Sequence, residues 1–167
     1  MKKLLIVIAF SLFLSTQMFG ADKQFGIGVT GGTFNSGISA KYNLGGNTAI
    51  QGTLGARGGD GFALGVDFII TMPPSLVKNA DVSLDWYAGV GGAIWHYSGR
   101  HSSKDYSWNT FAVSGVIGLS LMLQKVPLEF ALEWRPTFYI SGANDWYNGH
   151  HDGIYLFDMG GSIRWFF

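Results

Sequence analysis

Eight segments of this chain alternate between apolar residues and small or polar residues, and this alternation limits the fold more than any other feature. Successive side chains of a β-strand point to opposite faces, so a period of two predicts strands whose two faces meet different surroundings. Glycine-rich turns such as Gly45-Gly46-Asn47 separate some of the segments. The segments are Phe25–Thr30, Ile38–Leu44, Ile50–Arg57, Phe62–Ile70, Val82–Ile94, Phe111–Leu121, Leu128–Arg135 and Tyr155–Phe167.

The composition indicates that much of the surface does not face water. Only 13% of the residues are charged, whereas a soluble domain normally carries about 25%. After residue 20 the chain has no run of about 20 apolar residues, so we expect no membrane-spanning helix. A closed barrel is the other structure that satisfies its backbone in lipid. We therefore expect an all-β protein, an eight-stranded antiparallel up-and-down transmembrane β-barrel, formed by a single domain over residues 21–167.

The volume of the side chains predicts which face of the barrel is outside. An eight-stranded barrel has an interior that is only just filled by side chains. The apolar face carries too many large groups for that interior, among them Trp86, Trp134 and Trp165. We expect this face to meet lipid. The other face should line the lumen with a paired polar network made of Lys41, Arg57, Asp67, Asp85, Glu129, Glu133, Arg135, Asp158 and Arg164.

The connections between the segments differ in length. The turns around Gly45-Gly46 and Gln124-Lys125 are short, whereas His96–Asn109 and Ser141–Gly153 are expected to be long loops. Short periplasmic turns and longer outer loops are usual in outer-membrane barrels. Met72–Asp81 is a ten-residue exception among the short connections.

Two local features refine this expectation. Pro136 removes a donor from the hydrogen-bond ladder of the seventh segment, so we expect fraying or a bulge there. Aromatic residues are expected to form girdles at the two membrane interfaces, with Tyr139 and Tyr155 at the outer one.

The N-terminus has the pattern of a secretory signal peptide. Lys2 and Lys3 precede an apolar core over Leu4–Leu14, and Gly20 or Ala21 offers a small residue at the cleavage point. We therefore assign residues 1–20 to a signal peptide and expect export.

With these segments in place, the chain resembles the small eight-stranded outer-membrane barrels, the superfamily of the OmpA transmembrane domain, OmpX and the opacity proteins. The signal peptide, the strands over residues 24–167 and the C-terminal sequence Gly-Ser-Ile-Arg-Trp-Phe-Phe carry the resemblance. Ile163, Trp165 and Phe167 look like the insertion signal that the barrel-assembly machinery reads. The resemblance implies an integral protein of the outer membrane and says little about activity.

Three groups of residues are candidates for chemistry or binding. His96 and Ser98 resemble the pair that barrel lipid A deacylases use, but Thr110 stands where the acid would be, so we expect no catalysis. His150, His151 and Asp152, with Asp145 and His101, lack a recurring ligand spacing, so we expect no metal site. Aromatic residues in both long loops suit contact with lipopolysaccharide or a partner surface: Tyr97, Tyr106, Trp108, Trp146 and Tyr147.

These patterns predict a non-enzymatic surface protein whose rigid barrel presents two outer loops for binding or for envelope integrity. The expected partners are outer-membrane lipid, lipopolysaccharide and the barrel-assembly machinery, and we expect a monomer without cofactors. The formal charge is zero, or −2 without Lys2 and Lys3, which gives no basis for nucleic-acid binding. Three alternatives stay open: an enzyme acting on outer-leaflet lipid, a conduit for a small apolar solute, and a soluble lipocalin-like barrel.

Overall fold

The computed structural model of the protein describes residues 24–57, 61–101, 104–141 and 153–167, so the predicted signal peptide lies outside it. Eight strands form one closed antiparallel barrel in sequence order. β1 closes the barrel by pairing with β8, from Gly26 opposite Phe166 to Gly32 opposite Gly160. The strands are β1 (Phe25–Gly32), β2 (Ser36–Gly45), β3 (Thr48–Arg57), β4 (Gly61–Lys78), β5 (Val82–His101), β6 (Lys104–Leu123), β7 (Leu128–Ser141) and β8 (Gly153–Phe166).

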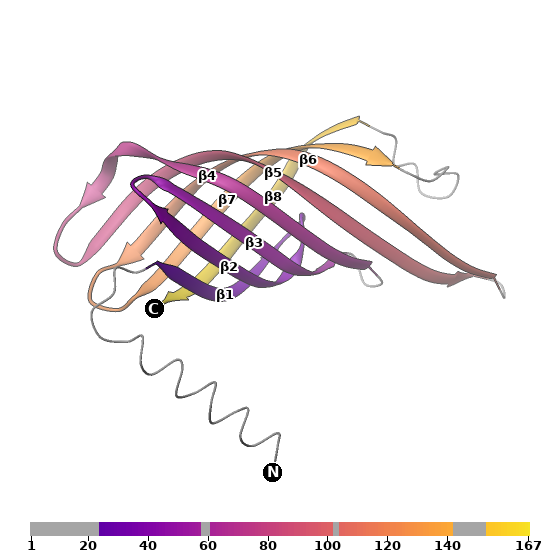
Figure 1. Ribbon diagram of the computed structural model, residues 1–167, viewed down its shortest axis with the longest axis horizontal. Helices are drawn as coiled ribbons and strands as arrows, with labels where there is room; N and C mark the ends of the chain where they lie inside the picture. Colours follow the sequence, from indigo (N-terminus) through magenta and orange to yellow (C-terminus); the bar gives the residue numbers. More distant parts are fainter. Residues whose placement is uncertain (1–23, 58–60, 102–103, 142–152) are drawn as a thin grey trace, which may run out of the picture.

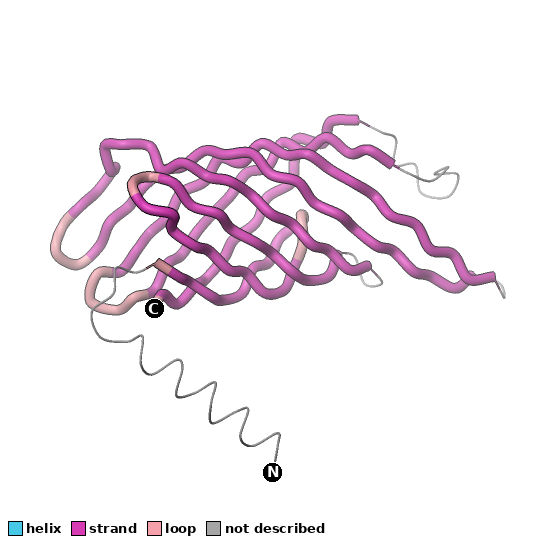
Figure 2. The backbone as a smooth tube through the Cα atoms, in the orientation of Figure 1, coloured by secondary structure: helices cyan, strands magenta, loops and turns pink. Residues whose placement is uncertain are grey.

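The prediction of an all-β, eight-stranded antiparallel up-and-down barrel is confirmed. The start of β1, the end of β8 and three tight connections lie at one end of the barrel, on the left in Figure 1 and in pink in Figure 2. We call this the terminal end and the opposite one the distal end. At the terminal end, Gly45 and Gly46 both have positive φ, which explains why glycine occupies this tight turn between β2 and β3.

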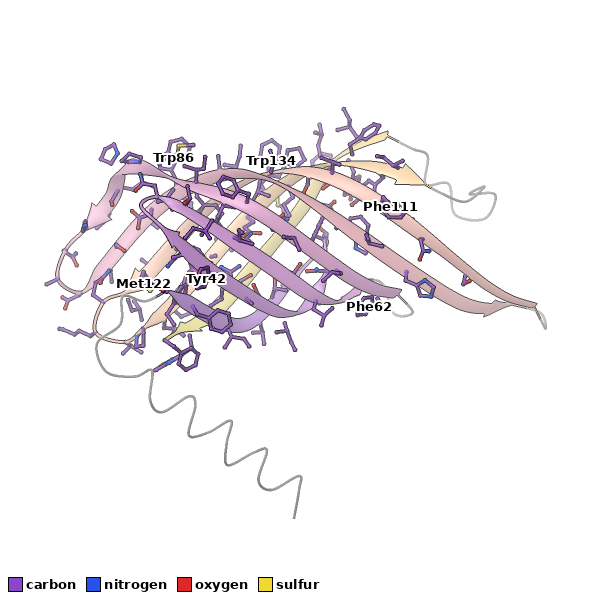
Figure 3. All side chains as sticks on the ribbon, in the orientation of Figure 1. Tyr42, Phe62, Trp86, Phe111, Met122 and Trp134 are labelled. Carbon is purple, nitrogen blue, oxygen red and sulfur yellow. The ribbon has the colours of Figure 1, made fainter. Side chains whose placement is uncertain are left out.

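The two faces of the barrel divide as the alternation predicted. Large apolar side chains point outward on every strand; Val29, Val90 and Leu132 are 60%, 65% and 67% exposed. Figure 3 shows Trp86 and Trp134 pointing away from the barrel wall. The interior holds polar and charged side chains together with two smaller clusters of buried apolar and aromatic ones. In the part of the chain that is described, no helix is both long and apolar enough to cross a membrane.

The prediction that Met72–Asp81 is a simple connection was wrong. β4 continues to Lys78, and the register with β5 shifts between Met72, opposite Trp86, and Val77, opposite Leu84. β4 therefore carries extra residues at this point, Pro73 to Leu76, which bulge out of the ladder. The bulge allows the β4–β5 hairpin to extend further at the terminal end before it turns.

The prediction of a long loop over His96–Asn109 was also wrong. β5 runs to His101 and β6 begins at Lys104, and the two strands pair along their full length. Figure 1 shows this hairpin extending beyond the other strands at the distal end. Aromatic residues such as Tyr97 and Trp108, which are register partners, favour strands over loops. Pairing also satisfies backbone groups that an open loop would leave to water.

The ladder is irregular at Pro136, as predicted, but the bulge lies in the partner strand β8 and not in β7 itself. The register between β7 and β8 shifts between Arg135, opposite Asp158, and Thr137, opposite Tyr155. β8 thus contains one extra residue, and its alternation reverses before Asp158. Tyr155 consequently sits opposite an interior residue and does not continue the outward row of Met159. Tyr139, assigned from sequence to an outer girdle, instead lies on the interior side of β7 and packs against Trp95.

Candidate functional site

The barrel interior holds two charged centres, and the first is built around Glu129 of β7. Lys41 Nζ lies 2.6 Å from Oε1 of Glu129, and Arg164 Nη1 lies 2.7 Å from Oε2. Ser120 donates a further hydrogen bond of 2.7 Å to Oε1. Glu129 is fully buried. Its carboxylate therefore depends on these donors, because a buried charge is stable only when it is paired and hydrogen-bonded.

The second centre is built around Arg135, which lies six residues after Glu129 on the same face of β7. Its guanidinium donates to both carboxylate oxygens of Asp67, at 2.9 Å and 2.6 Å. It also donates to Oε2 of Glu133 from Nε and Nη2. Tyr87 completes the group by donating its hydroxyl to Glu133 Oε1 at 2.7 Å. Arginine suits this position, since its planar fork matches a carboxylate with two parallel hydrogen bonds.

Gln51 of β3 joins the two centres. Its Nε2 donates to Asp67 at 3.0 Å and to Glu133 at 2.7 Å, while its Oε1 accepts from Arg164 at 3.1 Å. The amide thus uses both kinds of hydrogen-bonding group, and it is almost completely buried. The six charges of the two centres balance, three cations against three anions: Lys41, Arg135, Arg164, Asp67, Glu129 and Glu133.

Interior glycines provide the room for these long side chains. A Cβ added to Gly91 would lie 1.8 Å from Oδ1 of Asp67, and one added to Gly118 would lie 2.3 Å from Cζ of Tyr87. Any larger residue at position 91 or 118 would therefore displace a side chain of the charged centres. This explains why the lumen face combines glycine with a few large polar groups.

An aromatic cluster closes the distal end of the interior. Phe34, from the β1–β2 connection, turns inward and packs edge-to-face on Trp95 at 5.1 Å between ring centroids. The guanidinium carbon of Arg135 lies 4.6 Å from the centroid of Phe34, a cation–π contact. Asn35 anchors the connection by donating to Thr53 Oγ1 at 2.7 Å. The first distal connection therefore acts as a lid over the charged centres.

The structure places the predicted network residues as follows. Lys41, Asp67, Glu129, Glu133, Arg135 and Arg164 form the two centres described above. Asp158 is buried opposite Arg135 and accepts a hydrogen bond from the hydroxyl of Tyr139. Asp85 is half-buried on the interior side of β5, opposite Ser120, and stands apart from the ion pairs of the described residues. Arg57 is the last residue of β3, and its side chain lies outside the described part of the structure.

Several members of the site carry no formal charge, so the prediction of a charged network did not include them. The alternation nevertheless places four of them on the lumen face, where the network was expected: Ser39, Gln51, Tyr87 and Ser120. Their position in the alternating pattern is therefore the signal that could have identified them. Ser39 accepts a hydrogen bond of 2.8 Å from Arg164 Nε. Phe34 had no such signal, because it belongs to a connection without alternation.

His96 lies at the distal end, on the outward side of β5, next to Phe62 of β4 in the register. Its Nδ1 donates to Oδ1 of Asn109, its register partner on β6, at 2.8 Å. An amide orients the imidazole but supplies no negative charge to it. Ser98 is on β5 as well, with its side chain outside the described residues.

The remaining candidates lie partly outside the described residues. Within the described ranges, no group of three or more histidine, aspartate or glutamate side chains is placed to hold a metal ion. Asp145, Trp146, Tyr147 and His150–Asp152 lie outside those ranges. In the C-terminal strand, Ile163 and Trp165 point outward, while Phe166 is buried and covers Gly26.

The site as a whole is a paired polar core beneath an aromatic lid. Each buried carboxylate of the two centres has an arginine or lysine partner, so the arrangement stabilises and fills the barrel. It leaves no activated nucleophile among the described interior residues. Comparison of the chain with protein-family models, with curated proteins and with solved structures found no match in any of the three.

Proposed function

We propose that this protein is an integral β-barrel of a Gram-negative-type outer membrane, a surface protein without enzymatic activity. Its rigid barrel holds the β5–β6 hairpin and the β7–β8 connection outside the cell, for binding or for envelope integrity. The terminal end faces the periplasm. The observation that carries the proposal is the inverted distribution of side chains, apolar outside and charged inside.

Exposed apolar surface supports the membrane assignment. Soluble monomers rarely expose contiguous apolar patches larger than a few hundred Å². Here the outward side chains are apolar on all eight strands, among them Phe68, Val113 and Ile163. The same arrangement counts against a lipocalin-like barrel, because an apolar ligand would meet Arg135, Arg164 and Glu129 in the interior.

The packed interior also counts against a conduit. Side chains from β2 to β8 meet in the two charged centres, and Trp95, Tyr87 and Arg164 are almost completely buried. We therefore expect no single-channel events in planar bilayers. The closed β1–β8 pairing leaves no free strand edge in the barrel wall for a second copy, which supports a monomer.

Heat-modifiability in isolated outer membranes tests the proposal. The full chain is produced in a Gram-negative host, and unboiled and boiled samples are compared on a denaturing gel. We expect a faster-migrating unboiled band in the outer-membrane fraction. A single unchanged band with the protein in the soluble periplasmic fraction would refute the membrane assignment.

Surface labelling tests the orientation. An epitope inserted between His101 and Lys104, at the tip of the β5–β6 hairpin, should bind its antibody on intact cells. An epitope inserted between Gly46 and Asn47, at the β2–β3 turn, should bind only after the outer membrane is permeabilised. The reverse result would place the terminal end outside the cell.

A further inference from the structure

An apolar groove with a volume of about 1000 Å³ crosses the outer face of the barrel from β5 to β1. Its walls are two rows of outward side chains that follow the hydrogen-bonding direction across the strands. One wall is a series of successive register partners, Trp86, Leu119, Leu132, Gly161 and Gly31. The other wall contains Ile117, Trp134 and Met159.

Two features distinguish this groove from the ordinary gaps between rows of side chains. At its terminal end, Leu76 from the bulge in β4 lines the groove with Trp86, so the bulge supplies an end wall. At its distal end, Gly31 of β1 lies opposite Gly161 of β8, so no side chain projects outward from this register position. A Cβ added to Gly31 would meet only Ser36 Oγ, at 3.9 Å, so the space above it is open.

The dimensions of the groove match one leaflet of a bilayer. Four strand spacings separate β5 from β1, which gives a length of about 19 Å. Strands in such barrels are tilted by about 45°, so the groove rises by about 13 Å along the barrel axis. One leaflet of a hydrocarbon core of about 30 Å measures about 15 Å. The groove begins near the terminal end, at Trp86 early in β5, and ends at Gly31, the last residue but one of β1.

We propose that this groove holds an acyl chain of an anionic phospholipid from the periplasmic leaflet, an inference that rests on the membrane function proposed above. Lys78 follows the bulge by two residues, where β4 ends, and its side chain is exposed. It takes part in no ion pair with another described residue, whereas Lys125, in the β6–β7 connection at the same end of the barrel, is paired with Asp81 at 2.6 Å. Lys78 is the register partner of Ser83, on the inner side of the β4–β5 hairpin, so its long side chain has to reach a phosphate around the rim of the barrel. A phosphate held there places the acyl chain at the mouth of the groove, beside Leu76.

Photo-crosslinking in vesicles tests the proposal. The purified full chain is reconstituted in phosphatidylcholine vesicles that contain a small fraction of phosphatidylglycerol with a photoactivatable diazirine in its acyl chain. Adducts are then located by peptide mass spectrometry. We expect them to concentrate on groove residues such as Leu119 and Leu132, with few on the opposite outer face at Leu54 and Leu64.

Matched glycine variants make the test specific. Gly31→Leu fills part of the groove, so that about two methylene groups of the acyl chain lose their contact with the protein. This loss corresponds to about tenfold weaker binding, and we therefore expect about tenfold fewer groove adducts. Gly52→Leu, an outward glycine on β3 whose added Cβ meets only Gly65 O at 3.7 Å, should leave the adducts unchanged. Leu76→Ser opens the end wall at an exposed position and should also lower groove labelling.

The charge of the headgroup is tested separately. Lys78→Gln should remove the preference of the groove for the phosphatidylglycerol probe over a phosphatidylcholine probe with the same acyl chain. Adducts spread evenly around the barrel, or unchanged by Gly31→Leu, would overturn the groove while leaving the membrane barrel intact. Failure of the unmodified chain to insert into vesicles would instead overturn the proposed function.

Discussion

Replacement of Arg135 by methionine is the sharpest test of the charged interior. The guanidinium donates four hydrogen bonds to Asp67 and Glu133 and is almost completely buried. Arg135→Met leaves two carboxylates in the interior without their main cation. Loss of one partner from a buried ion pair costs about 3–5 kcal/mol. With a urea dependence of about 2 kcal/mol per molar, the unfolding midpoint should fall by about 2 M.

Tryptophan fluorescence of the barrel in lipid vesicles, followed through a urea titration, measures this change. The control is Lys125→Met, because the pair of Lys125 with Asp81 has side chains that are 80% and 63% exposed. Such a surface pair contributes about 0–1 kcal/mol, so its midpoint should hardly move. The double variant with Asp67→Asn should recover part of the lost stability, since it removes one of the stranded charges. Equal midpoints for Arg135→Met and Lys125→Met would refute the ion-pair reasoning.

Three further predictions concern other parts of the molecule. Gly91→Ala places a methyl group against the Asp67 carboxylate and should lower the free energy of unfolding by about 1–3 kcal/mol in the same titration. The control is Gly92→Ala, where the added methyl group points outward and should have little effect. Phe34→Ala should destabilise the barrel by about 3–5 kcal/mol, because the buried ring is lost from the distal lid; an unchanged urea midpoint would mean that the lid is not formed. His96→Ala should leave lipid A acylation unchanged in mass spectra of the extracted lipid, and altered acylation would favour the enzymatic alternative.

The bulge in β4 links the fold to the proposed lipid groove. If β4 continued past Met72 without a bulge, no residue of β4 would cover the outward side of Trp86 on β5. The extra residues instead bring Leu76 to this position. Bulges are frequent where a strand re-aims a side chain, and here the side chain closes one end of an apolar surface.

The interior explains how a barrel with this many charges remains compact. The ion pairs connect β2 to β7, β4 to β7 and β8 to β7, so they join strands that are not neighbours in the sheet as well as one pair that is. Strand β7 supplies Glu129, Glu133 and Arg135 from one face. The network therefore ties opposite walls of the barrel together, which supports the view of a rigid scaffold that presents its distal hairpin.

Much of the fold was predictable because the signal is local. The alternation of Phe62, Leu64 and Val66 with Ala63 and Gly65 assigns each residue to a face without knowledge of its partners. The turn at Gly45-Gly46 and the irregularity at Pro136 also follow from properties of single residues, namely positive φ and a missing N–H group. The errors occurred where alternation was absent or reversed, at Met72–Asp81, at His96–Asn109 and around Tyr155.

The sequence by itself determined the number of strands, the polarity of each face and the residue types available inside. Only the tertiary structure decided which of them meet, because Arg135 and Asp67 are 68 positions apart and Arg164 and Gln51 are 113 apart. Their contacts depend on the register of every strand around the closed barrel. The inward turn of Phe34 and the place of Leu76 beside Trp86 depend in the same way on surfaces supplied by distant strands, which no local pattern encodes.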